Sequence, residues 1–304
     1  MSATRIGIAP DSWGVWNAVD PKQPDAEQYL SEVADAGYTF TELGPYGYLG
    51  LDPNQVSDRI AKYGLKVSGG TVFTGLHTGT NAVDEQWAGV AEVAKMVVAQ
   101  GAEHLIVLPQ MWDRGETGMG EFHGKRAFTE EEWQLVTKNH NELGKRLLHE
   151  FGIKQVFHSH AESQVGSYNE VSRLIEETDE QYLNLCLDTG HFAYYYGDNV
   201  RLVQQYKQRI SYLHLKQVEP DYLADVLKND ISFVEAVQNG IMVEPPYGVP
   251  EYGDILAEAA KHVPGIYAII EQDMYPLKDF SEPKQIAIRT KTYIENLGVP
   301  VQFN

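Results

Sequence analysis

The sequence predicts a (β/α)8 barrel, and three observations support this prediction. Short β-rich segments alternate with longer amphipathic segments along the 304 residues, as they do in a parallel sheet whose strands are connected by helices. The alternation repeats about eight times, the number of repeats in a closed barrel of this size. The sequence contains no Pro/Ser-rich linker or low-complexity tract, so we expect residues 1–304 to form a single domain.

The predicted elements follow one another in regular order. Each predicted strand is a short run of β-branched, aliphatic or aromatic residues. The eight strands are expected at residues 5–9, 39–43, 66–72, 104–109, 153–157, 183–187, 210–215 and 267–271. Each predicted helix has apolar residues spaced three and four apart. These helices are expected at residues 25–36, 53–62, 82–99, 130–150, 166–177, 199–206, 252–262 and 283–296.

A doubly wound open sheet is the alternative architecture. Its usual nucleotide-binding form places GxGxxG directly after the first strand, where the glycines let the backbone approach a pyrophosphate. Here the first strand is followed by APDSWG, which lacks that glycine spacing. The motif therefore favours the barrel.

Composition restricts the partners. Against 43 acidic residues there are 24 basic ones, a formal net charge of −19, which argues against a nucleic-acid or anionic-membrane partner. The first residues lack a basic, apolar leader, and no apolar run approaches the roughly 20 residues that span a bilayer. We therefore expect a cytoplasmic protein that acts on a small molecule. The composition is also compatible with assembly into a homo-oligomer. The single cysteine, Cys186, lies inside a predicted strand and is expected to be an inert core thiol.

Ionisable and other polar residues recur near the carboxyl ends of the predicted strands, where ligands bind in α/β barrels. They are Asp11, Glu42, His77, Gln110, His158, His160, Glu162, Asp188, His191, His214, Lys216, Glu271 and Asp273. Burying several ionisable groups together is costly unless a cation or a substrate compensates them. We therefore predict a divalent metal site. Carboxylate and imidazole ligands without thiolate suit Mn²⁺, Co²⁺ or Mg²⁺ and are also compatible with Zn²⁺.

Several motifs carry a resemblance to a known family. LDTGH at 187–191, HLK at 214–216 and IIEQD at 269–273 resemble the xylose-isomerase-like barrels, a superfamily of sugar isomerases, epimerases and dehydratases. Within it, GIAPDSWGVW at 7–16 and ELGPYGYL at 42–49 resemble the inosose dehydratase family, whose members remove water from 2-keto-myo-inositol. GTVF at 70–73, FHSH at 157–160 and EQDMYPL at 271–277 support the same family. The resemblance extends nearly from end to end.

The resemblance implies a set of metal ligands. By matching motifs, these are Asp188, His214 and Glu271, with a fourth ligand after the fifth strand. Many superfamily members have a glutamate there, whereas this chain has His158, and its nearest acid is Glu162. Either residue could complete the set, and Glu162 is favoured. The chain departs from its superfamily relatives at two further places. It has HLKQ where HLKD is commoner, and it has VEPPYGVPEYGD at 243–254 where relatives usually have a short glycine-rich loop. These differences bear on the identity of the substrate more than on the fold.

The implied reaction is loss of water from a ketone. A divalent cation would polarise the carbonyl, Lys216 would stabilise the negative charge of an enediolate, and His160 or His191 would protonate the departing β-hydroxyl. We predict that Trp13, Glu42, His77 and His158 contact the substrate, a polyol or sugar.

The sequence leaves alternative functions, and two interpretations of one long segment. A metal-dependent keto-sugar isomerase or epimerase would use the same site, and a noncatalytic sugar-binding barrel is disfavoured because binding alone needs no metal. Metal-dependent cleavage of glycosidic carbon bonds is a further alternative. The long connection at residues 217–252 is interpreted as either a lid or an oligomer contact.

Overall fold

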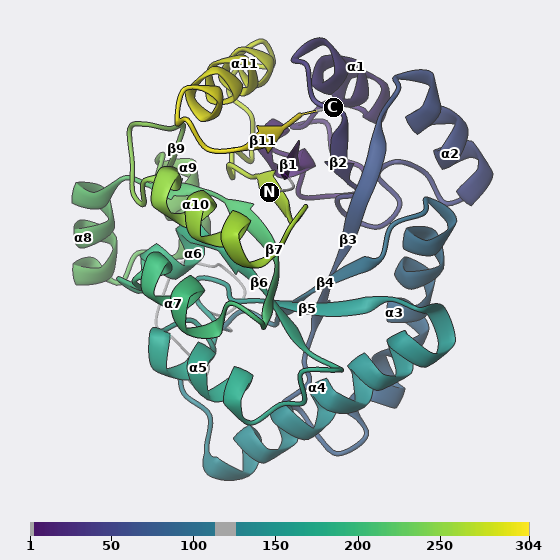
Figure 1. Ribbon diagram of the computed structural model, residues 1–304, viewed down its shortest axis with the longest axis vertical. Coiled ribbons are helices and arrows are strands. Elements are labelled where there is room, and N and C mark those ends of the chain that lie inside the picture. Colours follow the sequence, from purple (N-terminus) through teal and green to yellow (C-terminus); the bar gives the residue numbers. More distant parts are fainter. Residues whose placement is uncertain (1–2, 113–125, 304) are drawn as a thin grey trace.

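The computed structural model describes residues 3–112 and 126–303, and its parallel strands form a closed barrel (Figure 1). The barrel strands are β1 (Thr4–Ile8), β2 (Phe40–Glu42), β3 (Lys66–Thr74), β4 (His104–Pro109), β5 (Lys154–His158), β6 (Asn184–Asp188), β7 (Ile210–Leu215) and β10 (Tyr267–Ile270). Each strand pairs with the next, and β10 pairs with β1 to close the ring. The predicted barrel is confirmed, and the open sheet is excluded.

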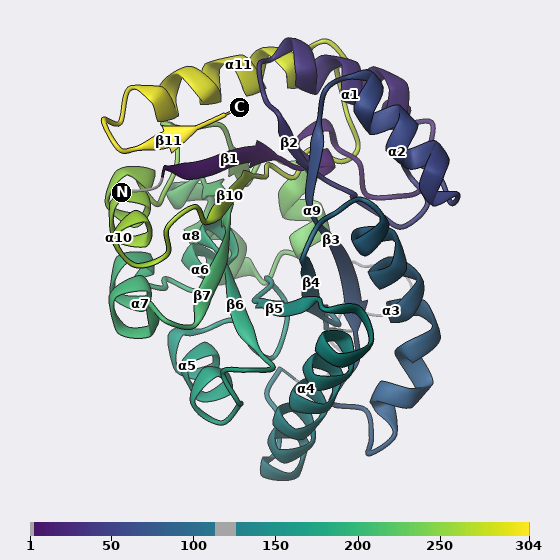
Figure 2. The same cartoon turned by 45° about the vertical axis from the view of Figure 1, so that its right-hand side comes forward.

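The helices predicted from the sequence form the outer layer around these strands (Figure 2). They are α1 (Ala26–Asp35), α2 (Pro53–Lys62), α3 (Ala82–Ala99), α4 (Glu130–Phe151), α5 (Tyr168–Glu176), α7 (Asn199–Tyr206), α10 (Tyr252–His262) and α11 (Glu282–Glu295). Side-chain caps fix where several of them begin. At α4, for example, Thr129 accepts a hydrogen bond from the backbone N–H of Glu132, whose carboxylate accepts one in return from the Thr129 N–H.

The barrel has two apolar layers. Inside the ring of strands, a small cluster fills the interior: Ala9, Ile106, Leu108, Val156, Cys186, Tyr212 and Ile269. A larger cluster packs between the strands and the helices. Burial raises the pKa of the Cys186 thiol to about 11, consistent with the inert core thiol expected from the sequence. The packed interior leaves the ligand site to the carboxyl ends of the strands.

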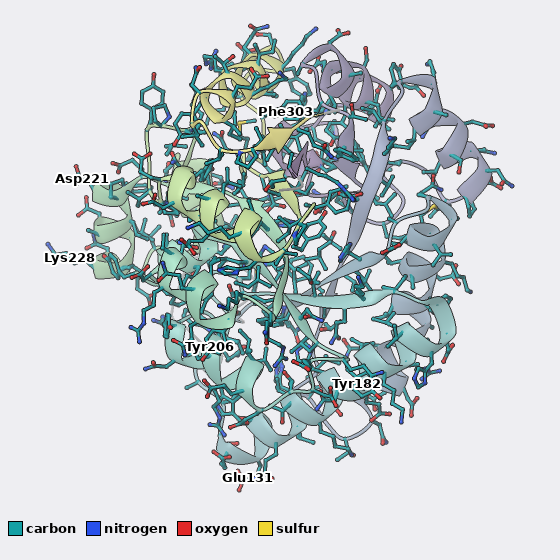
Figure 3. The ribbon with its side chains drawn as sticks, in the orientation of Figure 1. Glu131, Tyr182, Tyr206, Asp221, Lys228 and Phe303 are labelled. Atoms are coloured by element: carbon teal, nitrogen blue, oxygen red, sulfur yellow. The ribbon has the colours of Figure 1, made fainter. Side chains whose placement is uncertain are left out.

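The long connection after β7 is folded rather than irregular. Strands β8 (Gln217–Val218) and β9 (Met242–Val243) form an antiparallel pair that encloses α8 (Pro220–Asn229) and α9 (Phe233–Gln238). The labelled side chains of Asp221 and Lys228 lie at the outer edge of the molecule on α8 (Figure 3). Helix α9, in contrast, reaches the pocket through Phe233 and Val234.

Short elements complete the structure. The chain leaves β1 through the 3₁₀ helix η1 (Pro10–Trp13) and leaves β6 through α6 (Thr189–Tyr194), while β11 (Val301–Gln302) pairs with the beginning of β1. Among the described residues, none of the helices is both long enough and apolar enough to cross a membrane.

Candidate active site

Four buried side chains from neighbouring strands converge at the carboxyl ends of the barrel. His158 ends β5, Asp188 ends β6, His214 lies on β7 and Glu271 directly follows β10. Asp188 and His214 are partners in the strand register, and the Glu271 N–H donates to the carbonyl of Leu215 at 3.1 Å. Each of the four offers one ligand atom, and these atoms all lie within 4.8 Å of one another. The barrel register therefore assembles a group that could hold a divalent cation.

The surroundings of His214 indicate that a cation would stabilise this group of four residues. Its Nε2 donates to the Glu42 carboxylate at 2.8 Å, and Glu42 also accepts from the Tyr212 hydroxyl at 2.8 Å. The other ring nitrogen, Nδ1, lies 3.1 Å from Glu271 Oε2, and among the described residues it has no hydrogen-bond partner. Burial acts to lower the pKa of His214, but neighbouring groups, among them Glu271 and Glu42, raise it well above its usual value. Unless one of them carries a proton, Nδ1 and the Glu271 carboxylate are both acceptors and repel each other. Either a proton on Nδ1 or a metal ion bound to both atoms would remove this repulsion.

His158 takes the fifth-strand position in this group. Its Nε2 lies 3.2 Å from Asp188 Oδ2, and its buried Nδ1 has no hydrogen-bond partner within residues 3–112 and 126–303. Glu162, which the sequence favoured, is buried elsewhere and does not belong to the group. The chain turns at Glu162 with φ of 57°, and the Glu162 carbonyl accepts a hydrogen bond from the Trp112 N–H. This turn separates Glu162 from the other three predicted ligands.

The DTGH motif organises Lys216 as well as Asp188. The Thr189 hydroxyl accepts from the Lys216 N–H at 2.9 Å and donates to the Lys216 carbonyl at 2.7 Å. Gly190 leaves room for the lysine side chain, because a Cβ at this position would lie 2.6 Å from Lys216 Cγ. The other Asp188 oxygen, Oδ1, accepts from the His191 N–H at 2.7 Å and caps α6. One short motif thus positions an acid, an imidazole and an ammonium group.

Lys216 contacts three buried carboxylates. Its Nζ lies 2.7 Å from Asp273 Oδ2, 2.9 Å from Glu271 Oε2 and 3.5 Å from Asp188 Oδ2. Burial acts to lower the pKa of Lys216, but the carboxylates raise it well above its usual value. Conversely, burial acts to raise the pKa values of Asp188 and Glu271, and the Lys216 charge helps to bring both below their usual values. The ammonium therefore compensates part of the negative charge of these carboxylates.

The two histidines proposed for proton transfer lie against each other, with ring centroids 3.9 Å apart. His160 Nδ1 lies 2.7 Å from the Ala161 carbonyl, and the Ala161 N–H donates to His191 Nδ1 at 3.0 Å. The Phe233 ring packs against both imidazoles, at 5.1 Å and 5.2 Å between centroids. Burial lowers the pKa of His160 to about 3 and that of His191 well below its usual value. Both imidazoles are therefore neutral near pH 7 in this structure.

These groups open onto a pocket of about 440 Å³. His158, His160, His191, His214, Lys216 and Glu271 form part of its lining, with Trp16, Phe73 and Phe233 among the apolar side chains. The volume is sufficient for a cyclic polyol. The predicted catalytic residues thus line one pocket together with three of the four candidate metal ligands, while the fourth, Asp188, is fully buried beside them.

Three of the predicted substrate-binding residues lie outside this lining. Trp13 is fully buried, and its Nε1 donates to Glu32 at 2.7 Å. Glu42 is enclosed behind His214, as described above. His77 packs on Phe128, with 5.1 Å between ring centroids. His158, the fourth, lines the pocket as a member of the candidate metal group.

Trp16, Phe233 and Asp273 also line the pocket, although none of them was assigned a specific role from the sequence. Trp16 donates through Nε1 to Asp273 Oδ1 at 3.1 Å and stacks on Tyr275 at 5.2 Å between centroids. Asp273 was among the polar residues expected at the strand ends, where it follows Glu271 by two residues in IIEQD. Phe233 had no comparable signal because it reaches the site from the long connection after β7.

The fold and the buried group define the chain as a (β/α)8 barrel with a candidate metal site at the carboxyl ends of its strands. Comparison with known proteins gives the particular family. A family model described as xylose isomerase-like TIM barrel matches residues 30–288. An inosose dehydratase from Geobacillus kaustophilus (strain HTA426) is 31% identical over 302 residues, covering 96% of this chain and 94% of that protein. The chain belongs to the xylose isomerase-like TIM barrel family and, within it, to the inosose dehydratase family.

Two crystal structures share the fold at low sequence identity. The IOLI protein with a binding zinc atom aligns with a TM-score of 0.70 at 13% identity, covering 96% of this chain and 98% of that one. The probable 3-DHS dehydratase AsbF from Bacillus anthracis also aligns with a TM-score of 0.70 at 13% identity, covering 96% of this chain and 99% of that one. At this identity, the likeness establishes the barrel architecture alone.

Proposed function

We propose that this chain is a metal-dependent dehydratase that removes water from a cyclic keto-polyol such as 2-keto-myo-inositol (inosose). The observation that carries the proposal is the buried group of His158, Asp188, His214 and Glu271 beside Lys216 and two imidazoles in one pocket. The relationship to an inosose dehydratase extends over 96% of the chain and supports this choice of substrate.

The four residues suit a divalent metal, and we propose Mn²⁺ or Co²⁺, with Mg²⁺ and Zn²⁺ as alternatives. Two carboxylates and two imidazoles supply oxygen and nitrogen donors without thiolate. The His214 Nδ1 atom, 3.1 Å from Glu271 Oε2 and without a hydrogen-bond partner among the described residues, is the feature of the structure that a bound cation would satisfy. A bound cation would supply Lewis-acid polarisation of the substrate carbonyl and its neighbouring hydroxyl.

Side chains of the protein would stabilise charge, transfer the proton and bind the substrate. Lys216 provides a fixed positive charge for the oxygen of the enediolate that forms when the carbon next to the carbonyl loses its proton. A neutral imidazole beside it can accept that proton. Asp273 can accept hydrogen bonds from ring hydroxyls, and the Trp16 and Phe233 rings, which stack at 6.5 Å between centroids, offer apolar surface to the ring carbons. These side chains also limit the access of water to the imidazoles.

The test is to identify the product. Metal-reconstituted protein is incubated with a panel of keto-inositols and ketoses, and the products are analysed by mass spectrometry. We expect a product from inosose lighter than the substrate by one water, formed by metal-loaded protein and abolished by strong chelation. The wild type is compared with Asp188→Asn, which lacks the negative charge of one proposed metal ligand. A product of unchanged mass would replace the dehydratase with an isomerase or epimerase, and full turnover by metal-free protein would exclude the metal.

A further inference from the structure

His160 and His191 differ in whether a ring nitrogen remains available to a substrate. Both line the same pocket, and both are bound through Nδ1 to the same residue, Ala161. The distinction therefore depends on Nε2, the second nitrogen of each ring.

Both nitrogens of His191 are already in contact with the protein. Nδ1 accepts a hydrogen bond from the Ala161 N–H at 3.0 Å, and Nε2 lies 3.0 Å from Lys216 Nζ. The side chain is 1% exposed. To reach a substrate, His191 Nε2 would have to displace an ammonium that three carboxylates hold in place. His191 is therefore suited to positioning Lys216 and the Ala161 peptide.

His160 has the opposite arrangement. Its Nδ1 lies 2.7 Å from the Ala161 carbonyl, and because a carbonyl only accepts, Nδ1 must carry the proton. Neutral His160 then has a lone pair on Nε2. Among the described residues, the only side-chain hydrogen bond of His160 is made through Nδ1, and His160 lines the pocket. The peptide carbonyl thus fixes the tautomer in which the available nitrogen is a proton acceptor.

We propose that His160 is the single imidazole that exchanges protons with the substrate, and that it serves both halves of the dehydration. This inference rests on the proposed function. Nε2 takes the proton from the carbon next to the carbonyl, and the electron pair of the broken C–H bond enters the enediolate. Nε2 then gives the same proton to the β-hydroxyl as its C–O bond breaks, so that water leaves and the electron pair forms the C=C bond. Because one nitrogen serves both steps, the hydrogen and the hydroxyl leave from the same face of the ring.

The chain offers a matched pair of substitutions. In His160→Asn, the amide N–H can still donate to the Ala161 carbonyl, and in His191→Asn the amide oxygen can still accept from the Ala161 N–H. Each substitution therefore keeps a group that can make the Nδ1 contact and removes Nε2 together with the rest of the ring. The measurements are dehydration of inosose, exchange of the proton next to the carbonyl with deuterated solvent, and Mn²⁺ affinity.

We expect His160→Asn to lower both dehydration and exchange by about 10²–10⁴-fold, the usual contribution of a positioned acid–base group. His191→Asn should lower them together by about tenfold, as expected from one lost hydrogen bond. Neither substitution should remove Mn²⁺ binding. If His160→Asn kept rapid exchange, or if His191→Asn were the more damaged variant, the inference would be overturned while the dehydratase assignment stood.

A second measurement does not depend on turnover or on a variant that folds. Nitrogen-15 NMR spectra of the imidazoles in metal-free wild-type protein at neutral pH should show His160 protonated at Nδ1 and unprotonated at Nε2. The opposite tautomer would overturn the inference. If wild-type protein failed to dehydrate any keto-polyol, the proposed function would fail, and the NMR result would still decide the tautomer.

Discussion

Replacement of Lys216 by methionine removes the ammonium that compensates the buried carboxylates. Its Nζ lies 2.7 Å from Asp273, 2.9 Å from Glu271 and 3.5 Å from Asp188, and the residue is 2% exposed. Breaking a buried ion pair from one side typically costs about 3–5 kcal/mol, because the remaining charge is left uncompensated. We therefore expect Lys216→Met to lower the free energy of unfolding of metal-free protein by about 3–5 kcal/mol.

Metal should reduce this loss. A divalent cation bound by Asp188 and Glu271 would compensate those carboxylates, leaving Asp273 as the one that still lacks the Lys216 charge. We expect the loss in saturating Mn²⁺ to be smaller than in chelator by more than about 1 kcal/mol, because ligand binding stabilises the folded state by mass action. The assay is urea unfolding of wild-type and Lys216→Met protein, once with chelator and once with Mn²⁺.

The matched control is Lys228→Met on the exposed face of α8, which should change the free energy of unfolding by no more than about 0.5 kcal/mol. An equal loss for Lys216→Met with and without metal would refute the idea that lysine and metal compensate the same carboxylates. A loss below about 1 kcal/mol in chelator would refute the buried ion-pair energetics.

Two further predictions concern the neighbouring residues. Gly190→Ala would place a Cβ 2.6 Å from Lys216 Cγ, so we expect a loss of about 1–3 kcal/mol in urea unfolding; wild-type stability would contradict this close packing. Burial lowers the pKa of His160 to about 3, so between roughly pH 6.5 and 3 the unfolded state binds more protons at this residue than the folded state, and stability falls as the pH falls. In chelator, His160→Asn should make the decline in stability below pH 6.5 shallower, by up to about 1.4 kcal/mol per pH unit. Urea unfolding at pH 7 and 5.5 measures this difference, and identical slopes for the two proteins would contradict it.

The barrel and much of the site could be predicted because they depend on local patterns. Alternating segments identify the strands, and parallel strands in register bring their carboxyl ends together whatever the details of the loops. Asp188, His214 and Glu271 lie at or directly beside strand ends, so their convergence follows from the register.

The remaining assignments depend on the direction in which individual side chains point, which the local sequence does not determine. The choice between His158 and Glu162 depends on a left-handed turn in the loop after β5. Similarly, Trp13 and Trp16 are three residues apart, yet η1 directs Trp13 into the core and the following chain takes Trp16 to the pocket. Glu42 ends a strand as predicted, but its side chain bonds to His214 instead of lining the pocket. Such details depend on tertiary packing.

The identity of the ligands is tested most directly by Mn²⁺ titration of metal-free wild-type protein and two variants. If the metal is held by His158, Asp188, His214 and Glu271, His158→Asn should weaken Mn²⁺ binding by at least about 100-fold, since loss of groups that merely support a ligand already costs 10–100-fold. Glu162→Gln should leave the affinity close to that of wild type, because Glu162 lies outside the group. Strong loss in Glu162→Gln with little change in His158→Asn would contradict the proposed site.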